Sequence, residues 1–511
     1  MSDATQHEGL GRIETPLGTD ALLLRAFSGS ESLDKEFEFH ATVEAKENDA
    51  DLGKLLGEEV CVHLELPDGT TRAFAGVVTA ATVSDIAAER TLVLRPWLAL
   101  LGDASDHRVY REQTVVDIVD EVFARHGALA RHEWRLAESY SRLDFTVQYG
   151  ESDRDFVARL LERHGIYRYV EHDAASGRHT LILSDHVSMQ QPMAGYERIV
   201  FDADTANLRR DEEVVHGWRR EARHAPSRYT ARAYDYRQSH TRLEASESWQ
   251  DPASGFESGM ERYAWPGPFD TPADAERHVR ARAERWQSEL ALVDGETTAR
   301  GITPGRLFVL AEHPSSAENG EYLVVAASYR FDVAGFRSGM GGGAGFSCAF
   351  RALPTDVQHR PLPRTPVPRI DGVQSATIAG PEGEEIWTDE HGRVKLKFHW
   401  DRSDHEGERT SGWVRVSQLH AGKGFGAIDI PRVGEEVLAQ FHEGDPDRPV
   451  VVGRVYNDFN TTAESLPGRA MVTALRSNST PGGGGYNELV LDDRKGEELL
   501  ALRAEKDMRV E

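Results

Sequence analysis

Cysteine is almost absent from this chain. Cys61 and Cys348 are the two cysteines among its 511 residues, and they lie far apart in the sequence. Two such residues form neither a disulfide framework nor a metal-binding cluster, and this usage is ordinary for a chain that folds in a reducing cytoplasm. Long apolar runs are missing as well. Because nowhere do about eighteen apolar residues follow one another, we predict no transmembrane helix.

A secretion signal and an excess of positive charge are also missing. The chain begins MSDATQHEGLGRIETPLG, without a basic start or an apolar core, so we expect no signal peptide. Against 59 Lys and Arg stand 85 Asp and Glu, which gives a net charge of −26. Such an acidic chain stays soluble and does not favour a surface that binds nucleic acid.

The N-terminal two thirds read as β-structure with inserted helices. The length suggests about three domains, and alternating apolar residues between 22 and 100 predict strands. Three segments farther along show a capping residue followed by an apolar stripe, which predicts helices. Their first residues are Thr114, Ser152 and Thr271-Pro272. Gly165 is expected to end the second helix.

Residues 371–460 have the pattern of a small closed barrel. From 394 to 400 the residues alternate strictly, as in a half-buried strand. The apolar set is Val394, Leu396, Phe398 and Trp400, and the polar set is Lys395, Lys397 and His399. Four more strand-like runs lie at 374–378, 413–416, 437–441 and 450–455. Five short strands separated by Gly and Pro fit an OB-type barrel, and Asp445 is expected to cap the turn before the last one.

Proline, glycine and small polar residues mark the predicted boundaries. The predicted parts are an N-terminal region at 1–352, a Pro-rich linker at 353–370, the barrel at 371–460, a Gly/Ser/Thr-rich connector at 461–487 and a final part at 488–511. In the final part a period of two returns at 488–491 and 508–510. Strands this short cannot bury a face alone. We therefore predict that three copies around one axis complete one another's strands.

Motifs for catalysis, metal binding and cofactor binding are not found. The chain contains no G-x-S-x-G nucleophile elbow and no H-E-x-x-H zinc motif. Gly339-x-Gly341-x-x-Ala344 imitates a dinucleotide loop, but strand-like Phe346–Phe350 follows it in place of the helix that would receive the phosphates. We therefore assign no catalytic, cofactor-binding or metal-binding residue and predict that the protein is not an enzyme.

Binding of single-stranded nucleic acid is the main competing interpretation of the barrel. OB barrels do this with aromatic side chains on a basic groove. The residues available for such a face are Arg393, Lys395, Lys397 and Arg415, with Trp400 and Trp413 nearby. However, 384–457 holds ten Lys and Arg against fourteen Asp and Glu, and this surface would repel phosphates. We instead expect the basic side chains to form a solvated face or pairs between subunits.

Four segments of the barrel carry a family pattern: Glu384–Glu390 (EEIWTDE), Gly392–Lys395 (GRVK), Pro431–Val437 (PRVGEEV) and Gly444–Pro449 (GDPDRP). Together they resemble the OB domain of VgrG, the spike protein of bacterial type VI secretion and a relative of phage hub and tail-spike proteins. A segment at 149–156 (YGESDRDF) and those after it resemble the hub-like N-terminal part of the same family. The family-motif residues, to which we assign structural roles, are Gly392, Val394, Trp400, Pro431, Gly434, Gly444, Asp445 and Pro446.

The resemblance implies a fold class and a long C-terminal β-helix. The expected fold is mainly β with an α+β N-terminal part: two hub-like β-barrels with inserted helices, then the OB barrel, then the start of a triple-stranded β-helix. In the family this β-helix is long. Either this member is short or the sequence is a shortened form of a longer chain, and we expect the second.

The resemblance also implies partners. It predicts a homotrimeric spike that caps the Hcp tube, carries a PAAR-type tip protein and effectors or their adaptors, and crosses the target-cell membrane by puncture. Assembly would take place in the cytoplasm, followed by expulsion through the type VI secretion system. Two alternatives remain open: the hub-spike of a phage-like contractile injection particle, and a carrier of an effector enzyme fused beyond residue 511. A nucleic-acid-binding OB protein is the remote alternative.

Overall fold

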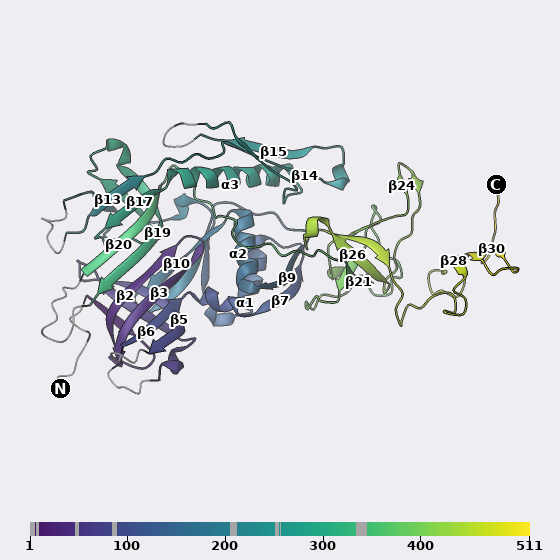
Figure 1. Ribbon diagram of the computed structural model, residues 1–511, viewed down its shortest axis with the longest axis horizontal. Helices are drawn as coiled ribbons and strands as arrows, with labels where there is room; N and C mark the ends of the chain where they lie inside the picture. Colours follow the sequence, from purple (N-terminus) through teal and green to yellow (C-terminus); the bar gives the residue numbers. More distant parts are fainter. Residues whose placement is uncertain are drawn as a thin grey trace. The chain divides into compact units, whose positions relative to one another are not determined.

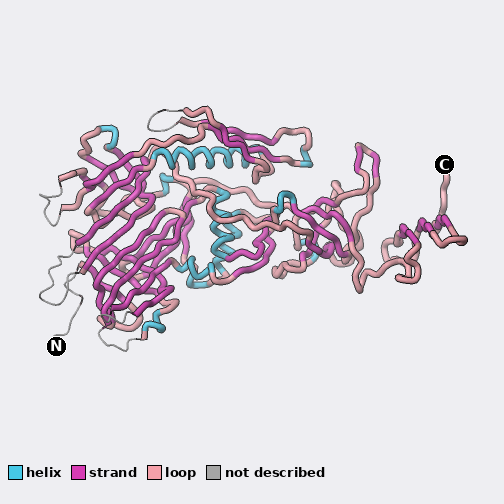
Figure 2. The backbone as a smooth tube through the Cα atoms, viewed as in Figure 1, coloured by secondary structure: helices cyan, strands magenta, loops and turns pink. Residues whose placement is uncertain are grey.

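Strands predominate in the computed structural model of the chain (Figure 2). The described residues are 6, 10–45, 51–83, 89–204, 212–250, 255, 257–333 and 345–511. The chain divides into two compact units. The first comprises Met1–Ala104, Val115–Ser141 and Ser152–Pro366, and the second comprises Ser105–Thr114, Arg142–Glu151 and Val367–Glu511. The second unit thus includes two short segments from the N-terminal part of the sequence, and the domain boundaries given above stay predictions.

A twelve-stranded sheet forms most of the first unit (Figure 1). Its earlier strands are β1 (Gly11–Glu14), β2 (Leu22–Ser32), β3 (Lys35–Ala45), β4 (Glu59–Glu65), β5 (Thr71–Val83) and β6 (Glu89–Arg95). Its later strands are β12 (Arg198–Val200), β13 (Val215–Arg220), β17 (Val293–Thr297), β18 (Leu307–Ala311), β19 (Gly320–Asp332) and β20 (Gly345–Pro354). Antiparallel pairing of β2 with β19 joins the two groups. Phe27 stacks on Phe331 and contacts Phe39 and Phe74 in the core, where all four rings are buried.

Among its described residues, the first unit also contains two smaller sheets and three α-helices. One sheet contains β8 (His132–Arg135), β10 (Tyr167–Asp173) and β11 (Arg178–Ser184), and the other contains β14 (Arg228–Ala233), β15 (Leu243–Ser248) and β16 (Glu261–Ala264). The helices are α1 (Val115–Ala124), α2 (Asp153–His164) and α3 (Pro272–Ala291). Ser152 and Thr271 cap α2 and α3 as predicted, by accepting hydrogen bonds from the backbone N–H groups of Asp155 and Asp274. Gly165 ends α2 with a φ of +74°, a conformation that favours glycine.

The predicted linker is anchored to the first unit. No helix or strand lies between 355 and 370, as expected of a Pro-rich segment. His359 and Arg360 are nevertheless buried. The His359 Nε2 atom lies 2.9 Å from Asp34 Oδ2, and the Arg360 guanidinium donates to Glu284 Oε2 at 2.7 Å and to the Gly165 carbonyl at 3.0 Å. Composition predicted the lack of regular structure. It did not predict these contacts, which hold the segment against the first unit.

The second unit contains the barrel, and its five predicted strands are confirmed. They are β21 (Gln374–Ala379), β22 (Lys395–Phe398), β23 (Arg415–Val416), β26 (Glu436–Phe441) and β27 (Pro449–Arg454), in the order β22-β21-β26-β27-β23. Val394, Leu396 and Phe398 lie in the barrel core, as their alternation predicts. A two-stranded sheet is formed by β7 (Ser105–Tyr110) and β9 (Thr146–Ser152). Tyr149 of β9 and the adjacent Phe145 pack against the barrel core from outside the predicted barrel segment.

The C-terminal part of the second unit is a three-stranded antiparallel sheet. Its strands are β28 (Val472–Arg476), β29 (Glu488–Asp492) and β30 (Leu499–Arg503), in that order. The predicted strand at 488–491 is confirmed. The strand predicted at 508–510 is wrong, because no strand lies there. The strand at 499–503, β30, pairs with β29 instead. The mainly β fold class with an OB barrel is confirmed.

Candidate assembly site

One face of the C-terminal sheet is made of leucine. Cross-strand pairing aligns Leu475, Leu489 and Leu502 in one row and Thr473, Leu491 and Leu500 in the next. Residues that face each other, and those two apart along a strand, share a face. The leucine face therefore consists of Leu475, Leu489, Leu491, Leu500 and Leu502.

The leucine face is largely uncovered in a single chain. The exposed fractions are 71% for Leu475, 68% for Leu500, 61% for Leu502 and 40% for Leu491. Single exposed leucines are common on proteins, but a contiguous apolar group marks an interaction surface. Burial of one leucine side chain contributes about 1.5–3 kcal/mol. The leucine face can therefore supply a substantial part of the free energy of association.

Part of the opposite face of this sheet is occupied by contacts within the chain. Val490 and Asp492 are buried there. The hydrogen bonds from Arg494 hold the pKa of Asp492 below its ordinary value, and Arg469 Nη2 lies 3.8 Å from the same carboxylate. Arg476 donates to Glu488 Oε1 and pairs with Glu464. These contacts hold the sheet together and leave the leucine face free for a partner.

The predicted family-motif residues lie apart from the leucine face, spread through the barrel. Gly392, Gly434 and Gly444 have positive φ angles of 69°, 86° and 74° in turns, and Val394, Pro431 and Pro446 are buried. Asp445 caps its turn as expected, since its Oδ1 accepts a hydrogen bond from the Asp447 N–H at 3.0 Å. Trp400 packs against the core and contacts His107 and Tyr149. A structural role for these residues in the family stays a prediction.

Arg415 of the barrel is exposed, as expected of a solvated face, whereas Lys395 and Lys397 are held by contacts within the chain. Lys395 is only 5% exposed. Its Nζ donates to the Ser411 carbonyl at 2.9 Å and lies 4.9 Å from the centre of the Trp413 ring. Burial, together with the nearby charge of Arg111, lowers the pKa of Lys395 to about 8. Lys397 pairs with the buried Asp401 carboxylate at 3.0 Å. Alternation predicted the two faces of the strand, but other parts of the second unit cover Lys395 on the polar face, while His399 is exposed.

Sequence reasoning missed two parts of this unit. Asp447 accepts hydrogen bonds from Thr146 Oγ1 at 2.9 Å and from the Val147 N–H at 2.7 Å. No sequence signal links residues separated by 300 positions. The leucine strand β30 was also missed, although the alternation of Leu500 and Leu502 was a usable signal.

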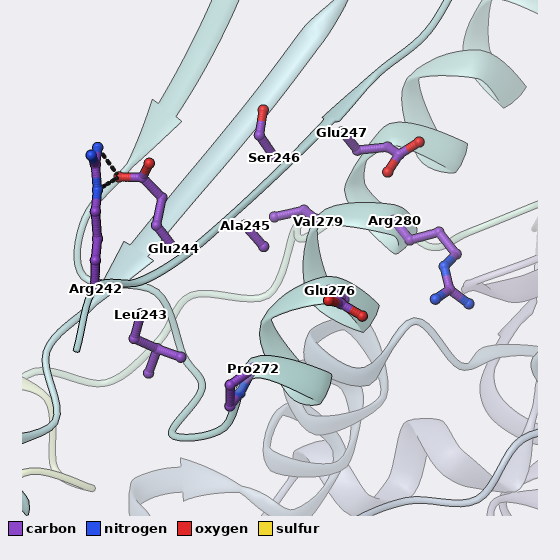
Figure 3. A pocket seen from close by; sticks show the side chains of 10 residues that line it. All are labelled: Arg242, Leu243, Glu244, Ala245, Ser246, Glu247, Pro272, Glu276, Val279 and Arg280. Atoms are coloured by element: carbon purple, nitrogen blue, oxygen red, sulfur yellow. Dashed lines mark hydrogen bonds and ion pairs between the residues drawn. The ribbon is translucent and has the colours of Figure 1, made fainter. Parts of the chain in front are cut away.

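A pocket of about 380 Å3 lies between β15 and α3 in the first unit (Figure 3). Its lining includes Leu243, Val279, Glu247 and Glu276, and Arg242 donates to Glu244 at its edge. Among the described residues that line it there is no His, Cys, Asp or Lys. Ser246 also lines the pocket, and its hydroxyl oxygen lies 2.8 Å from Thr230 Oγ1.

In the described part of the chain, no group of three or more His, Cys, Asp or Glu side chains is arranged to hold a metal ion. None of the helices in the same residues has the length and apolar character needed to cross a bilayer.

Three family models match the chain in succession. The phage tail baseplate hub (GPD) matches 30–334, the type VI secretion system/phage-baseplate injector OB domain matches 385–456, and the bacteriophage T4 gp5 C-terminal trimerisation domain matches 473–511. The last match contains the whole leucine face. A hub, an injector OB barrel and a trimerisation segment in this order define the class of baseplate hub and spike proteins.

Individual relatives narrow the class to a family. The type VI secretion system spike protein VgrG1c of Pseudomonas aeruginosa is 38% identical over 513 residues, which cover 99% of this chain and 70% of the relative. The actin cross-linking toxin VgrG1 of Vibrio cholerae is 30% identical over 510 residues, which cover 96% of this chain and 45% of the toxin. The chain belongs to the VgrG family of type VI secretion system spike proteins.

A solved structure shares the fold. The E. coli c3393 protein is described as a component of the type VI secretion system with structural similarity to the T4 bacteriophage tail proteins gp27 and gp5. It matches with a TM-score of 0.59 at 20% identity, over 87% of this chain and all of its own.

Proposed function

We propose that this chain is one third of a homotrimeric spike, held together in part by the leucine face. The observation that carries the proposal is the group of exposed leucines on β28, β29 and β30 inside the match to a trimerisation domain. In a threefold assembly each copy covers the apolar surface of the next and no strand edge stays open. Such an assembly is stiff along its axis and transmits force without catalysis.

The proposed spike caps the Hcp tube with its hub part and carries a PAAR-type tip protein and effectors or their adaptors. It assembles in the cytoplasm, is expelled by the type VI secretion system and punctures the target-cell membrane. Membership of the VgrG family supports this sequence of events. The relatives that match over most of this chain are named as spike proteins, which supports a mechanical role.

A fused effector is the second candidate function. The toxin VgrG1 of Vibrio cholerae aligns with this chain over 45% of its own length, so a relative combines a matching part with additional sequence. Sequence of the complete reading frame tests this candidate: a catalytic domain after the β-helix supports it, and a short tail contradicts it. The genes that surround the reading frame decide between a secretion system and a phage-like injection particle.

Solution mass tests the proposed trimer. Light scattering is measured over a range of concentrations on the 511-residue chain and on a longer form that continues past Glu511. We expect the longer form to have three times the mass of one chain throughout. The 511-residue chain is expected to dissociate on dilution, because fewer strands hold it together. A longer form that stays monomeric would contradict the proposal.

A further inference from the structure

A narrow hairpin, the finger (418–429), extends from the barrel strands near β24 (Figure 1). Its strands β24 (Ala421–Gly422) and β25 (Phe425–Gly426) pair only with each other in the described part of the chain. An isolated hairpin of this length is not stable in water without further contacts. Its conformation therefore needs support, which the structure supplies at its base.

The base of the finger is clamped by side chains. Asp429 N–H donates to Gln418 Oε1 at 3.0 Å, and Gln418 Nε2 donates to the Asp429 carbonyl at 3.3 Å. Arg454 of β27 donates to Asp429 twice, to the carboxylate at 2.9 Å and to the carbonyl at 2.7 Å. Above this clamp, Ala427 N–H donates to the His420 carbonyl at 2.8 Å. The finger is thus held in one register by the barrel.

Two glycines make the finger compact. A Cβ atom on Gly422 would lie 2.4 Å from the Phe425 ring, and one on Gly426 would lie 2.3 Å from the His420 carbonyl oxygen. The Phe425 ring therefore closes over the backbone of the opposite strand, where it meets the His420 ring edge to face at a centroid distance of 5.3 Å. A larger residue at Gly422 would displace the ring.

The surface of the finger is apolar and exposed. By the register of its hydrogen bonds, Leu419 faces Ile428 across the two strands, and these residues are 97% and 81% exposed. Phe425, on the other face, is 65% exposed. Lys423 is the only charged side chain between Gln418 and Asp429. A clamped projection with mostly apolar side chains loses little conformational freedom on binding, which favours association with an apolar partner.

We infer that the finger docks on a neighbouring copy of this chain, where the pair Leu419 and Ile428 becomes buried. This inference rests on the proposed trimer. The base of the finger is close to the trimerisation segment: Arg432, three residues past Asp429, donates to the carbonyl of Asn478, two residues past β28, at 2.6 Å. Because this contact places the base of the finger beside the trimerisation segment, we expect a neighbour bound through the leucine face to come within reach of the finger.

Photocrosslinking tests the contact directly. Leu419 is replaced by photoreactive benzoylphenylalanine in an equal mixture of isotopically light and heavy copies, at a concentration where light scattering finds the trimer. We expect crosslinked peptides that join light to heavy copies. The matched control places the same group at Val373, which is 53% exposed on the same unit and is expected to give few such peptides.

Substitution tests the energetic contribution. The double variant Leu419→Asp, Ile428→Asp should raise the concentration of half-dissociation about tenfold or more, since it removes two buried aliphatic contacts per chain. Because both side chains are exposed in the single chain, the fold should be retained. Gly422→Ala should weaken association through the displaced Phe425 ring, whereas Val373→Asp should leave it unchanged.

The outcomes separate this inference from the proposed function. Trimers with crosslinks only within one chain, or trimers as stable in the double variant as in the unchanged protein, would overturn the docking of the finger and leave the spike intact. A 511-residue chain that is monomeric at every concentration would also overturn it. The mass of the longer form then tests the proposed trimeric spike independently.

Discussion

At the scale of single residues, the first unit contains a buried group of interacting charged and polar side chains. Glu31 accepts hydrogen bonds from the Arg72 guanidinium at 3.1 Å and the Tyr329 hydroxyl at 2.6 Å, and its other oxygen lies 3.3 Å from His172 Nε2. Burial alone would raise the pKa of Glu31. The hydrogen bond from His172 and the charges of His172 and Arg72 outweigh burial and leave this pKa below its ordinary value.

Replacing Glu31 should destabilise the first unit. Glu31→Gln leaves the buried Arg72 without its counter-charge, and we expect a loss of about 3–5 kcal/mol in urea unfolding at pH 7. A carboxylate with a lowered pKa stabilises the fold above about pH 4.5, and this contribution is lost as the pH falls through the folded-state pKa. The difference between the two proteins should therefore shrink in acid. Glu390→Gln, at an exposed side chain, is the control; an equal difference at pH 7 and pH 3 would contradict the assignment.

Lys395 of the barrel should also give a stability that rises with pH, but in an alkaline range. Its folded-state pKa of about 8 lies below the ordinary 10.5, so the unfolded chain binds a proton that the folded barrel releases between these values. Stability from this group therefore rises with pH from about 8 to 10.5. Lys395→Met removes that rise, and we expect any stability advantage of the variant to decline by about 1–3 kcal/mol between pH 7 and 10. Urea midpoints at both pH values measure it, with exposed Lys423→Met as the control.

At the scale of elements, the Asp447 carboxylate is one of the contacts that tie the pair of strands β7 and β9 to the barrel. Thr146 and the backbone of Val147 are buried and both donate to Asp447. Hydrogen bonds to a charged acceptor contribute about 1.5–3 kcal/mol each. The turn at 444–449 therefore shapes the barrel and also fixes a strand from a distant part of the sequence.

Removal of the Asp447 carboxylate should loosen the contact between β9 and the barrel. For Asp447→Ala we expect faster hydrogen exchange in peptides that cover 142–151, and a destabilisation of the second unit by about 2–4 kcal/mol. Asp404→Ala, at an exposed position of the same unit, should change neither. Unchanged exchange at 142–151 would show that other contacts hold β9 against the barrel.

At the scale of the whole molecule, the two faces of the C-terminal sheet provide a matched comparison. Leu500 lies on the leucine face and Leu499 on the opposite face of the same strand, and they are 68% and 57% exposed. Leu500→Gln should raise the concentration of half-dissociation of the trimer about tenfold, since it removes one buried apolar side chain per copy. Leu499→Gln should have a smaller effect. Equal effects in light scattering would argue against the leucine face as the interface.

Much of the barrel follows from rules that act over a few residues. The alternation from Val394 to Phe398 predicted a half-buried strand because successive side chains of a strand point to opposite faces. Asp445 was expected to cap its turn because its side chain reaches the backbone two residues on. The helix caps Ser152 and Thr271 depend in the same way on atoms three residues away. The family motifs extended these local predictions to the order of the domains.

Tertiary structure alone decided the features that depend on distant residues. The sequence by itself determined the five strands of the barrel, the apolar face of β22 and the caps where α2 and α3 begin, because each depends on near neighbours in the chain. It did not determine that Lys395 is buried, that β9 belongs with the barrel, or that five leucines of three strands form one uncovered face. These features depend on which segments fold against one another, and Thr146 meets Asp447 only after the chain between them has folded.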